Sequence, residues 1–76
     1  MKTITIKDEF IKLGQAMKLA DVVSDGVRAK YAILDEEVKV NGEICTQRGK
    51  KLYPGDTFTF EGITVKIEND NKESGT

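Results

Sequence analysis

The sequence predicts an α+β fold in which two consecutive helices pack on a small, mainly antiparallel sheet of about four to five strands. Two features of the pattern support this prediction. Apolar residues recur at helical spacing between residues 9 and 34, and they alternate with polar residues from residue 38 onward, where Gly-containing turn sequences separate the segments. The chain has 76 residues, enough for one domain, which we expect to span residues 1–68.

A short strand and a helix are expected first. Residues 3–6 alternate polar and apolar side chains, which is typical of a half-buried strand whose two isoleucines point inward. The next apolar residues predict a helix over about residues 9–20, with Asp8 as N-cap and Phe10 on the apolar side. Gly14 lies inside this helix at a cost of roughly 1 kcal/mol relative to alanine. We therefore expect another element to pack closely against this turn.

A second helix is expected after a short link. Ser24 is its candidate N-cap, helical spacing continues to residue 34, and the pattern ends at the acidic residues 35–37. Because the link is short, the two helices should pack as a helix-turn-helix pair. Their outward sides would carry Lys12, Lys18, Arg28 and Lys30.

The second half of the chain begins with a hairpin. Asn41-Gly42 predicts a type I′ turn, because both residues tolerate the positive φ angles that this turn requires. A two-residue loop at this point places Val38 opposite Cys45. The cysteine side chain should therefore face the core.

Two further turns complete the predicted sheet. Residues 53–56, Tyr-Pro-Gly-Asp, are typical of a type II turn. Glu61-Gly62 closes the last hairpin, in which the phenylalanines of residues 57–60 share an apolar face with Ile63 and Val65.

The residue types present argue against an enzyme or a metal site. The chain has no histidine and a single cysteine, Cys45, so a zinc cluster is not expected. Without an imidazole, neither Ser24 nor Cys45 has a base to activate it. The acidic residues show no paired spacing for acid–base catalysis. We therefore expect no catalysis and no cofactor.

No sequence feature predicts a membrane partner. The N-terminal residues lack the continuous apolar stretch of a signal peptide, and no run approaches the roughly 20 apolar residues of a membrane span. Residues 69–76 contain no apolar side chain and are expected to form a disordered tail. We expect a cytoplasmic monomer.

Basic residues are unevenly distributed, although the formal net charge is −1. Between Lys12 and Lys51 there are eight basic and six acidic residues, whereas the rest of the chain has four basic and seven acidic ones. Within residues 39–51 the charged residues are Lys39, Arg48, Lys50, Lys51 and Glu43. A phosphate backbone is the commonest partner of such a patch, and ordinary solvated surface is the alternative.

Several short motifs follow one another along the chain. They are Ala29-Lys30, Val38-Lys39-Val40-Asn41-Gly42, Arg48-Gly49-Lys50-Lys51-Leu52 and Pro54-Gly55-Asp56. In this order they resemble the alpha-L RNA-binding domain, the family named after the fourth protein of the small ribosomal subunit. The resemblance covers about residues 10–61. The stretch Phe10-Ile11-Lys12-Leu13-Gly14-Gln15-Ala16 makes the chain most similar to the short, free-standing bacterial members of YaaA-like type.

The resemblance implies a two-helix alpha-L motif and non-catalytic binding of structured RNA, either ribosomal or transfer RNA, possibly on the ribosome. Phosphate contacts from a basic face would carry the binding. The contact residues that the resemblance implies are Lys12, Gln15, Lys18, Lys30, Arg48, Lys50 and Lys51. We add Arg28, Lys39 and Asn41 as further candidate contacts. The family usually has glycine at the end of the second helix, where this chain has Glu36.

One alternative comes from a different class of protein. The first strand, Thr-Ile-Thr-Ile, and the length of 76 residues would also suit a small protein-interaction or ubiquitin-like carrier domain. The chain ends in Glu-Ser-Gly-Thr rather than in paired glycines, and two consecutive helices precede the main hairpins. Both features favour the RNA-binding interpretation.

Overall fold

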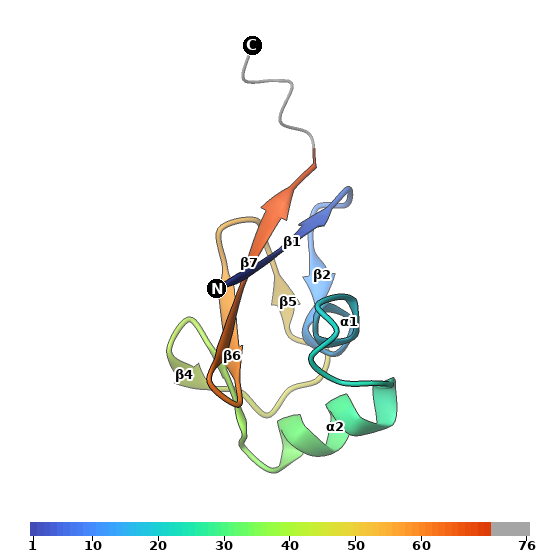
Figure 1. Cartoon of the computed structure of the whole chain (residues 1–76), viewed down its shortest axis with the longest axis vertical. Coiled ribbons are helices and arrows are strands. Elements are labelled where there is room, and N and C mark those ends of the chain that lie inside the picture. Colours follow the sequence, from blue (N-terminus) through green and yellow to red (C-terminus); the bar gives the residue numbers. More distant parts are fainter. Residues whose placement is uncertain (71–76) are drawn as a thin grey trace.

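The computed structural model describes residues 1–70 and has a five-stranded sheet, a separate two-stranded sheet and two helices (Figure 1). The elements in chain order are β1 (Lys2–Ile6), β2 (Ile11–Lys12), α1 (Leu13–Leu19), α2 (Gly26–Leu34), β3 (Val38–Val40), β4 (Glu43–Ile44), β5 (Lys51–Leu52), β6 (Thr57–Phe60) and β7 (Ile63–Asn69). The predicted fold class, two helices on a mainly antiparallel sheet, is confirmed.

The larger sheet has the strand order β1-β7-β6-β3-β4. All its pairs are antiparallel except β1–β7, in which Ile4 lies opposite Ile67 in a parallel register. The second sheet is a short antiparallel pair, β2–β5. The sequence did not predict this pair, because two-residue strands are too short to show an alternating pattern.

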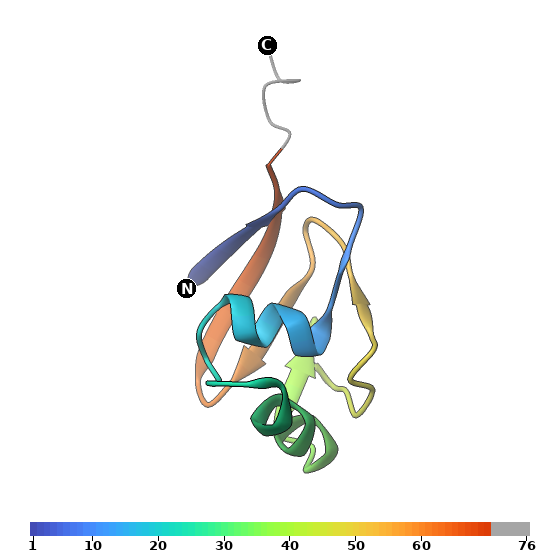
Figure 2. The ribbon, with the colours of Figure 1, turned by 90° about the vertical axis from the view of Figure 1, so that its right-hand side faces the viewer.

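The core lies between the helices and one face of the larger sheet, and in Figure 2 α1 crosses in front of that sheet. The largest fully buried side chains are Phe58, Leu13, Met17, Ile33, Leu52, Ile67, Val38 and Val65. Ile4 and Ile6 are also buried, as predicted. Cys45 is half-buried against the core, and its N–H donates to the carbonyl oxygen of Val38 at 2.9 Å, in agreement with the predicted hairpin register.

Both predicted helix starts were wrong. The first helix begins at Leu13 rather than at residue 9, and Asp8 does not cap it. Its cap position carries no side-chain hydrogen bond, because backbone carbonyl oxygens from a distant loop take that role: Leu13 N–H donates to Lys50 O at 2.8 Å and Gly14 N–H to Arg48 O at 3.2 Å. A sequence pattern detects side-chain caps, and it cannot detect a cap from a remote backbone segment.

The second helix is capped by Asp25 rather than by Ser24. Its carboxylate accepts a hydrogen bond from the N–H of Arg28 at 2.9 Å. The helix ends before Asp35, and Glu36 then adopts a φ of 63°. This is the left-handed conformation that glycine adopts most easily, so Glu36 makes the helix exit that the family usually makes with glycine.

The three predicted turns are confirmed. Asn41-Gly42 has φ angles of 51° and 88°, and Glu61-Gly62 has 52° and 80°, both as a type I′ turn requires. Gly55 has a φ of 100°, and the N–H of Asp56 donates to Tyr53 O at 2.9 Å, as expected for a type II turn.

At the C-terminal end, β7 continues to Asn69, and the N–H of Asp70 donates to the carbonyl oxygen of Ile6 at 2.8 Å. The first two residues of the expected tail are therefore paired with the N-terminal strand. The remainder of that expected tail, residues 71–76, lies outside the described residues. Within residues 1–70, neither helix has the length and apolar character needed to cross a membrane.

Candidate nucleic-acid interface

A groove of about 600 Å³ opens between α1, the N-terminal half of α2 and the loop that leads into β5. Its lining residues are Lys12, Gly14, Gln15, Lys18, Gly26, Val27, Lys30, Arg48 and Gly49. We call this the basic groove. It brings together five of the residues predicted from the sequence, namely Lys12, Gln15, Lys18, Lys30 and Arg48.

The first helix supplies two groove residues because of its periodicity. Gln15 and Lys18 are three residues apart and exposed, whereas Ala16 and Met17 are buried on the other side of α1. The stem of Lys18 reaches α2, since its Cδ lies 4.0 Å from the position that a Cβ would take on Gly26. The two helices therefore form adjoining walls of the same groove.

A close backbone approach fixes the third wall. A Cβ on Gly14 would lie only 2.9 Å from Cγ of Arg48, and the N–H of Gly14 donates to the carbonyl oxygen of Arg48. Glycine therefore leaves room for the Arg48 side chain in this turn of α1, in agreement with the close packing expected there from the sequence. The contact holds the backbone of Arg48 against the start of α1, and Arg48 lines the groove from this position.

The groove is strongly cationic. Its lining contains three lysines and one arginine, and it contains no acidic residue. Within residues 1–70 the salt bridge found joins Lys66 and Glu68, on β7, with 3.7 Å between the charged atoms. Since no carboxylate of the described chain pairs with the groove cations, their charge is available to an anionic ligand.

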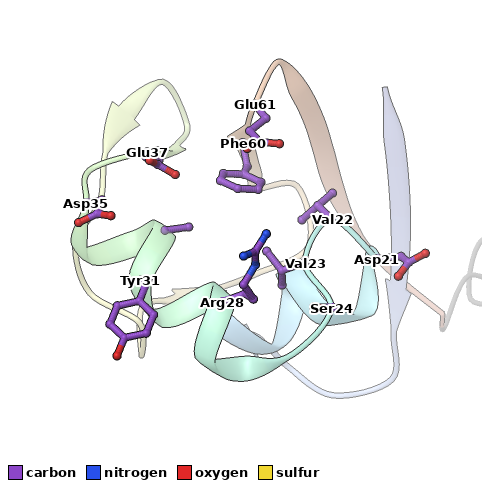
Figure 3. A pocket seen from close by; sticks show the side chains of 11 residues that line it. Asp21, Val22, Val23, Ser24, Arg28, Tyr31, Asp35, Glu37, Phe60 and Glu61 are labelled. Carbon is purple, nitrogen blue, oxygen red and sulfur yellow. The ribbon is translucent and has the colours of Figure 1, made fainter.

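Arg28 does not join this groove. It lies on another side of α2, in a hollow of about 490 Å³ where its guanidinium points inward (Figure 3). The acidic residues that line this hollow are Asp21, Asp35, Glu37 and Glu61, and its apolar lining comes from Val22, Val23, Ala32 and Phe60. We call it the acidic hollow. Arg28 is the only basic residue among those that line it.

Lys50 and Asn41 lie in a third place. Both line a shallow hollow beside β4 that also contains Cys45. The amide of Asn41 is engaged within the protein: its Nδ2 donates to Asp56 at 3.2 Å, and its Oδ1 accepts from the N–H of Thr57 at 3.0 Å. These contacts tie the first hairpin to the start of β6, so a structural role accounts for Asn41.

Two more predicted residues lie on strands. Lys39 is exposed on β3, between Ile44 and Thr59 on the neighbouring strands, and does not line the basic groove. Lys51, on β5, lies opposite Lys12 of the groove. Like charges directly opposite each other repel, so an anion bound between Lys12 and Lys51 would reduce the repulsion between their ammonium groups.

An aromatic pair beside the groove was missed. Phe10 was assigned to the core from helical spacing, but it precedes β2 and is only half-buried. Its ring centroid lies 5.8 Å from that of Tyr53, and the ammonium of Lys51 lies 4.8 Å from the Phe10 centroid. The alternation Phe10-Ile11-Lys12 facing Lys51-Leu52-Tyr53 was the signal that could have revealed it.

The described residues offer no arrangement for metal chemistry. Within residues 1–70, no group of three or more cysteine, aspartate or glutamate side chains is placed to hold a metal ion. Side-chain nitrogen and oxygen atoms buried in this part of the chain all have hydrogen-bond partners. The distinctive chemistry of this surface is its unpaired positive charge.

The comparisons with known proteins agree with this geometry. The sequence model of the S4 domain family matches residues 4–68. The probable ribosome maturation protein RlbA of Bacillus subtilis is 49% identical over 60 residues, which cover 79% of this chain and 84% of that protein. The putative RNA-binding protein YbcJ of Escherichia coli is 33% identical over 61 residues, covering 80% of this chain and 87% of that protein.

A solved structure is similar as well. The solution structure of YbcJ from Escherichia coli, which was described as revealing an alfaL motif involved in RNA binding, superposes with a TM-score of 0.70. The sequences are 32% identical, and the match covers 90% of this chain and 87% of that one. The resemblance to the alpha-L family noted in the sequence is confirmed.

Proposed function

The chain belongs to the S4 domain family, and we propose that it is a non-catalytic module that binds structured RNA through phosphate contacts from the basic groove. The observation that carries this proposal is the convergence of Lys12, Lys18, Lys30 and Arg48 on one groove without an acidic residue. Double-stranded RNA is recognised mainly by shape and by contacts to phosphates and 2′-hydroxyls. Such recognition needs cations held on a rigid frame.

The groove also offers different kinds of contact. Arg48 can donate two parallel hydrogen bonds to one phosphate, whereas the lysines act as point charges. Gln15 is exposed between them and carries both a donor and an acceptor, which suits a 2′-hydroxyl. In this proposal Lys51 extends the groove beyond Lys12, while Lys39, Lys50 and Arg28 lie outside the principal contact.

Ribosomal RNA is the RNA class that we favour over transfer RNA. The support is the similarity to a probable ribosome maturation protein across most of both chains. A cytoplasmic location and action as a monomer belong to the same proposal. The ubiquitin-like alternative is disfavoured, because the chain belongs to the S4 domain family and has two consecutive helices before its main hairpins.

The salt dependence of RNA binding tests this proposal. Affinity for a fluorescein-labelled RNA hairpin is measured by anisotropy over a series of potassium chloride concentrations, for the wild type and for Lys18→Ala/Arg48→Ala. Each lost phosphate contact should reduce the slope of log K against log salt by about 1, so the double variant should lose about 2. An unchanged slope in the double variant would show that the groove cations do not meet phosphates.

The control is Lys66→Ala, which removes a lysine from β7 that is already paired with Glu68. Its slope should equal that of the wild type. Crosslinking the protein to RNA in cells and sequencing the attached fragments would then identify the RNA.

A further inference from the structure

We propose that the exposed side of the β2–β5 pair is a binding site for one unpaired RNA base, stacked on Tyr53, next to a helix held in the basic groove. This inference rests on the proposed function and adds to it a class of substrate: folded RNA in which a nucleotide is bulged or unpaired beside a stem. The residues involved are Phe10, Lys12, Lys51 and Tyr53.

The strand register places these four side chains on one side. In the β2–β5 pair, Ile11 lies opposite Leu52 and Lys12 opposite Lys51. Leu52 is fully buried and Ile11 packs against the core, whereas both lysines are exposed. Because side chains alternate along a strand, Phe10 and Tyr53 point to the same exposed side as the lysines. The site is therefore continuous with the basic groove through Lys12.

The ring geometry selects Tyr53 as the stacking surface. The two ring planes are tilted by 51°, so a flat base can lie parallel to only one of them. The ammonium of Lys51 lies over the Phe10 ring at 4.8 Å from its centroid, whereas Tyr53 remains 47% exposed. A base on Tyr53 would meet Phe10 at an angle, as in the tilted aromatic pairs common in proteins.

Two hydrogen bonds within the turn fix the backbone of Tyr53. The N–H of Tyr53 donates to the Asp56 carboxylate at 2.8 Å, and the following turn closes with the Asp56-to-Tyr53 backbone hydrogen bond. The neighbouring lysines are placed to meet the phosphates that flank an extruded nucleotide. Aromatic stacking combined with adjacent cations is the usual way in which proteins hold unpaired RNA bases.

A pair of RNA hairpins that differ by one base tests the proposal. Both carry a single bulged nucleotide at the same place in the stem, which is 2-aminopurine in one hairpin and an abasic residue in the other. The phosphates and the shape of the backbone are thus matched. The wild-type protein should bind the 2-aminopurine hairpin at least about fivefold more tightly than the abasic one, as expected for one base–aromatic stack. Binding should also quench the fluorescence of the 2-aminopurine base.

The decisive variant is Tyr53→Leu, which removes the ring while the backbone contacts remain available. It should bind both hairpins equally and as tightly as the wild type binds the abasic one. The matched control is Tyr31→Leu, which removes an exposed tyrosine from the acidic hollow, 59% exposed against 47% for Tyr53, and should keep the full preference. Circular dichroism during thermal unfolding verifies that both variants fold.

The outcomes separate the two proposals. Equal binding of both hairpins by the wild type, or a preference that survives in Tyr53→Leu, would overturn the stacking site while leaving the RNA-binding groove intact. Failure of the wild type to bind either hairpin would reject both proposals. Loss of the preference in Tyr31→Leu as well would show that the base lies elsewhere.

Discussion

The basic groove and the acidic hollow both border α2, yet they carry opposite charge. The groove, of about 600 Å³, is lined by four cations and no acid, and the hollow, of about 490 Å³, by four acids and one cation. Helical spacing produces this separation: Val27 and Lys30 lie on one side of α2, whereas Arg28, Tyr31 and Asp35 lie on the other. A net charge of −1 is therefore compatible with a strongly cationic face.

Under the proposed function, this difference in charge favours RNA on the groove side of α2 over the hollow side. An RNA backbone in the groove is attracted by the cations there and repelled by the carboxylates of the hollow. In the proposed complex, the acidic residues would thus restrict where RNA binds.

Reversing charge in the groove should have the largest effect. Lys12→Glu/Lys18→Glu is expected to weaken binding of the RNA hairpin by at least about 100-fold, because two charge-assisted contacts of ~1.5–3 kcal/mol each are lost. Fluorescence anisotropy measures the change. The matched control, Lys7→Glu/Lys66→Glu, alters net charge equally away from the groove and should lose far less affinity. Similar losses in both variants would mean that overall charge, and not the groove, determines binding.

A smaller effect is expected from Gly14→Ala. The added Cβ would displace the Arg48 side chain, so hairpin affinity should fall by several-fold. The stability measured by urea unfolding should change by less than about 1 kcal/mol, because the higher helix propensity of alanine offsets the strained contact. In an Arg48→Ala background the same substitution should no longer affect affinity, as a double-mutant cycle would show. A full additional loss there would exclude Arg48 as the link between Gly14 and RNA.

Neutralising the acidic hollow should change affinity least, and in the opposite direction. Asp35→Asn/Glu37→Gln is expected to strengthen hairpin binding by about twofold at low salt, since it removes repulsion that acts over about one Debye length. The gain should disappear at high potassium chloride concentration. Weaker binding at low salt would show that the hollow contributes to the RNA interface.

The sequence predicted the parts of the fold that depend on neighbouring residues. The Asn41-Gly42 and Glu61-Gly62 turns were predicted from the φ angles that those residues tolerate. The pairing of β6 with β7 was predicted from the alternation of polar and apolar residues along both strands. The start of α1 was missed because its cap comes from the backbone of Arg48 and Lys50, more than thirty residues away in the chain.

The basic residues of the candidate site could be predicted from the sequence, but which of them lie together in one groove could not. The sequence selects Lys30 and Arg28 alike, as basic residues on the outward side of one helix, and only the packing of α1 and residue 48 against α2 separates them. Phe10 was misplaced for a related reason. Its helical spacing resembled a core position, while pairing of β2 with β5 turns it outward beside Tyr53.

A comparison of Lys30→Gln with Arg28→Gln decides whether RNA binds on the groove side of α2. Each variant removes one positive charge, two residues apart on the same helix, and hairpin affinity is measured by anisotropy at one salt concentration. We expect about a tenfold loss of affinity for Lys30→Gln, equivalent to one charged hydrogen bond, and less than about a twofold change for Arg28→Gln. Equal losses, or a larger loss for Arg28→Gln, would mean that RNA does not bind on the groove side of α2.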